Sequence, residues 1–109
     1  MSASQRRKGA RGELEVLQLL HAHGWPAAHR NFGSGSRGGG DIAHGPAGTV
    51  LEVKRHGGRL DLPAALRQAH AAAGPLDIPV VAHRRDGQEW QATLPLDELL
   101  ALLRLRETA

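Results

Sequence analysis

The chain has 109 residues, with 14 lysines and arginines against 11 acidic residues, a formal net charge of +3 and 40% hydrophobic residues. This length and composition allow one domain with a modest core. The absence of cysteine excludes disulfides and thiolate zinc sites, and no apolar run approaches the length of a membrane span. We therefore expect a cytoplasmic protein.

The first twelve residues carry several positive charges and no acid. We expect residues 1–12 to form a basic, flexible tail and residues 13–109 to form a single domain. Further positive charge surrounds Asp41 and Glu52. Basic clusters around a carboxylate pair suit a polyanion such as DNA, although taken alone they are more simply explained as a solubilising surface. The predicted DNA contacts are Arg6, Arg7, Lys8, Arg11, Arg30, Arg37 and Arg55.

A helix is predicted over residues 13–23, because Val16 and several leucines recur at helical spacing and Gly24 supplies a stop. Glu13 lies on the apolar face of this helix, where a carboxylate needs a reason. The simplest reason is that an acid in the first turn interacts favourably with the helix dipole. Glu15 faces elsewhere, and we expect it to be solvated.

A short strand is predicted over residues 27–32, followed by a glycine-rich loop over residues 33–40. The loop lacks the Lys-Ser/Thr ending and the following helix of a nucleotide-binding P-loop, so ATP binding is not expected. Because the loop adjoins Asp41, we interpret it as a segment that closes on substrate, with an ordinary flexible connector as the alternative.

Two further strands are predicted over residues 41–44 and 49–55, and the glycine-proline turn between them can fold the first back on the second. We expect this hairpin to bring Asp41 near Glu52. Alternate side chains of a strand share a face, so Glu52 and Lys54 should point the same way.

The second half of the chain predicts a helix, two strands and a final helix. Asp61 is placed to cap a helix that has a proline in its first turn and ends at Ala73. Strands follow over residues 78–83 and 89–94, and a leucine-rich helix over residues 95–106. The order α-β-β-β-α-β-β-α predicts an α/β fold, with a small mixed β-sheet flanked by helices. The leucines of the last helix form an apolar face that is broader than one contact with the core requires. Contact with a second protein is one explanation.

Asp41, Glu52 and Lys54 suit the hydrolysis of a phosphodiester. Carboxylates are hard oxygen ligands for Mg²⁺ or Mn²⁺, and the Val53 backbone carbonyl can complete the set. The Lys54 ammonium can position the nucleophilic water or neutralise charge that develops on the phosphate. An acid followed by Glu-x-Lys is a weak signal alone, and the neighbouring glycine turn, apolar residues and basic residues strengthen it. His21 and His23 are a possible metal-binding pair, but no motif supplies a third ligand for a zinc site. The sequence has no Gly-x-Ser-x-Gly motif, so acyl transfer is not indicated.

Four segments together resemble a known family. Asp41 with Glu52-Val53-Lys54 matches the PD-(D/E)XK nuclease pattern. Residues 8–13, 30–36 and 94–99 are similar to three segments of archaeal-type Holliday junction resolvases, which phages also have: a basic Lys-Gly-x-x-x-Glu opening, a segment with a catalytic serine, and an apolar-Pro-apolar-acidic start of a helix. The chain departs from the pattern at Gly40, where the family has proline, and in a loop that is shorter and richer in glycine.

The resemblance implies a restriction-endonuclease-like fold and a homodimer that makes paired, symmetric nicks in four-way DNA junctions with Mg²⁺, or Mn²⁺ as a substitute. It implies Asp41, Glu52 and the Val53 carbonyl as metal ligands, with Glu13 as an optional further ligand. Gln68 on the second predicted helix is an auxiliary candidate. The catalytic residues that it implies are Glu13, Ser34, Asp41, Glu52 and Lys54.

Two alternatives remain open. One is a related PD-(D/E)XK nuclease that acts on flaps, mismatches or duplex ends. The other is a non-catalytic DNA-binding module whose acids form surface ion pairs with lysine and arginine.

Overall fold

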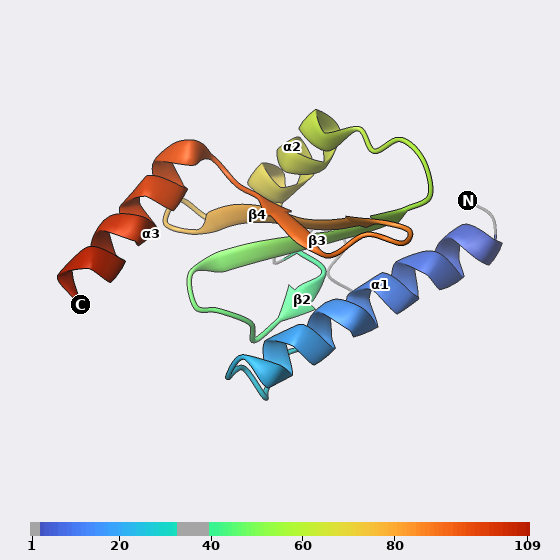
Figure 1. The fold of residues 1–109 in the computed structure, drawn as a ribbon, viewed down its shortest axis with the longest axis horizontal. Helices are drawn as coiled ribbons and strands as arrows, with labels where there is room; N and C mark the ends of the chain where they lie inside the picture. The colour runs from blue at the N-terminus through green and yellow to red at the C-terminus, as the bar shows by residue number, and fades with distance from the viewer. Residues whose placement is uncertain (1–2, 33–39) are drawn as a thin grey trace.

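The computed structural model describes residues 3–32 and 40–109, which form three helices and five strands in an α/β fold (Figure 1). The order α-β-β-β-α-β-β-α is as predicted. The elements are α1 Ala3–Ala22, β1 His29–Arg30, β2 Ile42–Ala43, β3 Thr49–His56, α2 Leu62–Ala72, β4 Ile78–Arg85, β5 Gln91–Thr93 and α3 Leu96–Thr108. The predicted cap of α2 is confirmed, because the Asp61 side chain accepts a hydrogen bond from the Ala64 N–H.

Helix α1 begins earlier than predicted, at Ala3 rather than at Glu13, so residues 3–12 of the predicted tail are helical. Arginine, lysine, glutamine and alanine are good helix formers, and the segment contains no proline. Gly12 lets this helix approach β3 closely, because a Cβ atom there would lie 3.1 Å from Cβ of Arg55. The helix therefore brings its basic first half alongside the strand that carries Glu52.

The main sheet is mixed. β3 and β4 are parallel, with Thr49 opposite Ile78 and Glu52 opposite Val81, and α2 connects them. β5 pairs antiparallel with the other edge of β4. The sheet therefore has the order β3-β4-β5, and β3 is an edge strand whose free edge faces β2.

The predicted hairpin between β2 and β3 is wrong. β2 pairs antiparallel with β1 in a separate two-stranded sheet, with Arg30 opposite Ile42. The chain leaves the extended conformation directly after β2, where His44 has a φ of 57°, so no ladder continues along β3. One backbone hydrogen bond still joins the two segments, from the Asp41 N–H to the Leu51 carbonyl at 2.8 Å.

The sheet lies between α1 and α2, as Figure 1 shows, with a small core on each side. On the α2 side, Ala65 and Ala69 pack against Val81, which is fully buried. None of the residues of α3 is buried, and this helix extends away from the sheet. Within the described part of the chain, no helix is both long enough and apolar enough to span a membrane. The core on the α1 side is built from Val16, Leu17, Ala28, Ile42 and Val53.

Candidate active site

A pocket of about 600 Å³ lies between the first half of α1 and β3. It brings together Glu13, Asp41 and Lys54, three of the residues that the sequence analysis selected, although they come from different parts of the chain. Val53 and Arg55 of β3 also line it. The other lining residues are Arg6, Gly9, Ala10 and Arg30.

The backbone around Asp41 is held by several hydrogen bonds. The Asn31 N–H donates to the Asp41 carbonyl at 2.9 Å, and the Asn31 side-chain amide donates to the Gly40 carbonyl at 3.1 Å. The Asp41 carboxylate accepts a hydrogen bond from the Val53 N–H at 2.7 Å. Asp41 is thereby fixed against the free edge of β3. Asn31 was not selected from the sequence as a residue that holds the site.

The backbone conformation at Gly40 excludes the proline that the PD pattern has at this position. Its φ of 70° lies in the left-handed region, and proline is restricted to a φ near −65°. A Cβ atom at this position would lie 2.6 Å from the Leu51 carbonyl oxygen and 2.9 Å from a methyl group of Val50. The close approach of Gly40 to β3 is what places Asp41 beside Glu52.

Glu52 is buried, with 4% of its surface exposed. Its register opposite Val81 places it on the α2 face of the sheet, and alternation puts Lys54 on the same face, as predicted. The Oε2 atom of Glu52 has no hydrogen-bond partner in the described part of the chain. Burial, and then the neighbouring Asp41 carboxylate, raise the pKa of Glu52 to about 7, whereas Lys54 acts in the opposite direction.

The Asp41 and Glu52 oxygens suit a divalent cation. Two adjacent carboxylates without a cation repel one another, and an unpaired buried oxygen is costly. The N–H and C=O of one strand residue lie on the same edge, so the Val53 carbonyl shares the edge at which its N–H meets Asp41. These are hard oxygen donors, and Mg²⁺ commonly uses one or two carboxylates together with substrate phosphates. The described residues contain no group of three or more histidine, aspartate or glutamate side chains that could hold a metal ion.

Glu13 lines the pocket but is committed to Arg30, which donates to its carboxylate at 2.6 Å. The Arg30 guanidinium also lies over the ring of Phe32, 4.6 Å from the ring centroid. This contact is a cation–π interaction. Glu13 is therefore oriented by β1, and its negative charge raises the pKa of Glu52 only as the weakest of the causes that act on it.

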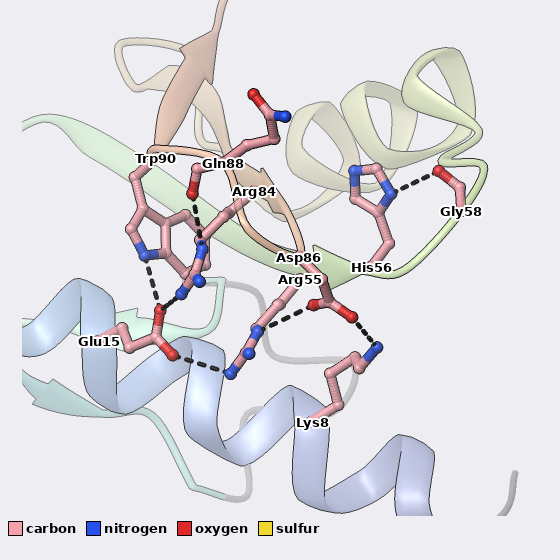
Figure 2. A network of polar contacts seen from close by, with 9 residues as sticks. All are labelled: Lys8, Glu15, Arg55, His56, Gly58, Arg84, Asp86, Gln88 and Trp90. Carbon is pink, nitrogen blue, oxygen red and sulfur yellow. Dashed lines mark hydrogen bonds and ion pairs between the residues drawn. The ribbon is translucent and has the colours of Figure 1, made fainter.

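Three of the predicted DNA contacts are engaged with acids, and Figure 2 shows two of them, Lys8 and Arg55. Lys8 forms an ion pair with Asp86 at 2.7 Å. Arg55 donates to Asp86 at 3.2 Å and to Glu15 at 2.9 Å, and Arg30 is paired with Glu13. Arg6 lines the pocket, whereas Arg7 and Arg11 are exposed on α1.

Glu15 is a site residue that the sequence analysis missed, because it expected this side chain to be solvated. Its carboxylate accepts hydrogen bonds from Arg55, Arg84 and the Trp90 ring N–H, the last at 3.0 Å. Figure 2 shows these side chains converging on Glu15 from β3, β4 and the segment before β5. The Lys8 and Arg55 cations also lower the pKa of Asp86.

Three predicted residues lie away from this arrangement. Ser34 and Arg37 fall outside the described residues. Gln68 is exposed on α2 and does not line the pocket.

Comparisons of the chain with protein families, with curated proteins and with solved structures give no match.

Proposed function

We propose that the protein is a Mg²⁺-dependent, structure-selective DNA endonuclease of the restriction-endonuclease-like fold, and most specifically a Holliday junction resolvase. The observation that carries the proposal is the buried Glu52 carboxylate. It lies beside Asp41 with an unpartnered oxygen, and Asp41 in turn lines a pocket with a basic rim, although Glu52 itself does not line that pocket. A surface ion pair would have satisfied both oxygens, which favours this proposal over a non-catalytic DNA-binding module.

Asp41, Glu52 and the Val53 carbonyl would hold the Mg²⁺. When bound, the ion supplies Lewis-acid stabilisation of the negative charge that develops on the phosphate. Lys54 has no ion pair with any described residue, so its ammonium is available to position the attacking water or to neutralise the phosphate. Arg6 and Arg55, on opposite sides of the pocket, add positive charge along which a DNA backbone would lie.

The proposal includes Glu13 as an acid of the site and an optional further ligand. In the structure it is paired with Arg30. A DNA phosphate that attracted Arg30 would release Glu13 towards Asp41. Ser34 stays a prediction from the resemblance, as a catalytic residue on the glycine-rich segment. Gln68 also stays a prediction, although its exposure on α2 gives it no support.

A homodimer is also part of the proposal, because paired nicks in a symmetric junction need two active sites. The exposed leucines of α3 offer apolar surface for a protein contact. Analytical ultracentrifugation at micromolar concentration should give twice the chain mass of 11.6 kDa. A monomer at all concentrations would remove paired nicking by a preformed dimer. We place the enzyme in the cytoplasm, which suits a chain without cysteine.

Cleavage assays with labelled four-way junction, flap and linear duplex DNA test the function. With Mg²⁺ we expect symmetric nicks in the junction and little cutting of the duplex. Equal cutting of both would remove the junction preference and favour a related nuclease with another DNA substrate. If no DNA is cut and Mg²⁺ produces no thermal shift, the protein is not this enzyme, and the DNA-binding module becomes the better explanation.

Single substitutions test the chemistry. Asp41→Asn, Glu52→Gln and Lys54→Ala should each lower cleavage by at least about a hundredfold and leave junction binding in Ca²⁺ intact. Asp97→Asn and Glu107→Gln are matched controls, because both residues are exposed on α3, away from the pocket. A wild-type rate in any of the first three variants removes that residue from the mechanism.

A further inference from the structure

Arg55 is the basic residue of the pocket whose orientation is most completely determined. It lines the pocket beside Lys54, yet its side chain is only 18% exposed. Two carboxylates on different elements hold it. Its Nε donates to Asp86 in the turn after β4, and one terminal nitrogen donates to Glu15 on α1.

Glu15 is itself held in place. One of its oxygens accepts from Arg84 and from the Trp90 ring N–H at 3.0 Å, while the other accepts from Arg55 at 2.9 Å. Asp86 is likewise held from its other side by Lys8 at 2.7 Å. Neither carboxylate can turn away from Arg55 without breaking a second interaction, as Figure 2 makes visible.

A guanidinium has five N–H donors in a planar fork. The contacts with Glu15 and Asp86 use the Nε–H and one terminal nitrogen, and the remaining donors are engaged by no residue that the structure describes. Because the guanidinium is planar, fixing two of its nitrogens also fixes the direction of the other donors. An arginine held in this way presents preoriented donors to an anion without first losing side-chain freedom.

We infer that Glu15 and Asp86 are positioning residues that aim Arg55 at the phosphate of the bound DNA. This inference rests on the proposed nuclease function. Arg55 would stabilise the charge that develops on the phosphate during cleavage, and the two acids would act through it.

Simple electrostatics makes the opposite prediction, which makes the inference testable. Removing a negative charge near a site for a polyanion should strengthen DNA binding and leave the chemical step unchanged. If the acids position Arg55, their removal should slow the chemical step even when the DNA is saturating. A freed arginine still attracts DNA, but it no longer holds its donors in the geometry of the transition state.

The test is single-turnover cleavage of a four-way junction at saturating protein with Mg²⁺, together with junction affinity in Ca²⁺. Glu15→Gln and Asp86→Asn should each lower the saturated rate about tenfold, while junction affinity stays equal or increases. Glu107→Gln, which removes an exposed acid paired with Arg104 on α3, should leave the rate unchanged. Unchanged saturated rates in both test variants would overturn the inference.

A double-mutant cycle separates positioning from a general structural effect. In an Arg55→Ala background, Glu15→Gln should cause no further loss of rate, because the group that it orients is gone. A full tenfold further loss would show that Glu15 acts independently of Arg55 and would overturn the inference. Asp86→Asn keeps the test decisive if Glu15→Gln fails to fold, since Asp86 lies in an exposed turn. If wild-type protein cuts no DNA, the proposed function fails; if wild type cuts and these variants match it, only this inference fails.

Discussion

Replacing Gly40 with alanine should destabilise the protein more than the same change at a glycine whose surroundings have room for a Cβ atom. A non-glycine residue in the left-handed conformation costs about 1–2 kcal/mol. The added Cβ would also lie 2.6 Å from the Leu51 carbonyl oxygen, which is backbone of β3 and cannot rotate away. Forcing an atom into such a contact costs about 1–3 kcal/mol. We therefore expect Gly40→Ala to lower the free energy of unfolding by about 2–5 kcal/mol.

Gly48 offers a matched control. Its φ of 74° is nearly that of Gly40, and a Cβ atom there meets nothing within 4 Å. Gly48→Ala should therefore cost only the conformational part, about 1–2 kcal/mol. Equilibrium urea unfolding, followed by circular dichroism, measures both free energies. The difference between the two variants isolates the clash with β3.

An equal loss of stability in the two alanine variants would refute this reasoning, because it would mean that β3 accommodates the added atom without cost. Gly40→Pro introduces the proline of the PD pattern. It should destabilise the protein at least as strongly as Gly40→Ala, because the proline ring prevents the backbone from adopting a φ of 70°. A stabilised Gly40→Pro protein would show that the backbone at this position is not fixed as described.

Three further predictions concern the carboxylate pair and the helices. The pKa of Glu52 is raised to about 7, so the protein without metal should lose stability as the pH rises from the unfolded value of 4.5 through 7. For the same reason, Mg²⁺ binding should release a proton below pH 7 and scarcely any at pH 8.5. Calorimetry in buffers of different ionisation enthalpy counts the released proton, and equal release at pH 6 and pH 8.5 would contradict the prediction. Asp41→Asn should lower the pKa of Glu52 and leave the protein without metal at least as stable at pH 8 as wild type. The same variant should abolish the Mg²⁺-induced thermal shift, and a retained thermal shift would remove Asp41 from the metal site. Leu103→Ser on the exposed face of α3 should change the free energy of unfolding of monomeric protein by no more than about 0.5 kcal/mol, whereas Val81→Ala in the core should lower it by about 1–3 kcal/mol. Similar values for the two variants in urea unfolding would show that α3 is packed.

The element order was predictable because it depends on local patterns. Periodic leucines, the cap at Asp61 and the alternation in β3 are each visible within a few residues. The start of α1 was missed for a related reason, since apolar periodicity marks only the part of a helix that is buried against a core. Its basic first half lies along β3 without an apolar stripe.

Strand pairing and the polar network were less accessible. β1 and β2 have two residues each, too few for a pattern to indicate which strands pair. The proximity of Asp41 and Glu52 was expected from a hairpin, whereas the structure achieves it through Gly40 and the hydrogen bonds of Asn31. Glu15 finds its partners 40, 69 and 75 positions away in the chain, so nothing in its own neighbourhood signals them.

The parallel pairing of β3 with β4 has a consequence for how the site forms. A hairpin could assemble locally, but Thr49 meets Ile78 only after the intervening chain, including α2, has closed the crossover. Loop-closure entropy must be overcome before such a ladder yields its hydrogen bonds, and parallel sheets form slowly for this reason. Glu52 and Lys54 should therefore become ordered late, together with the whole β3–α2–β4 unit. A metal-binding probe in refolding experiments would then report the completion of the fold and not an early hairpin.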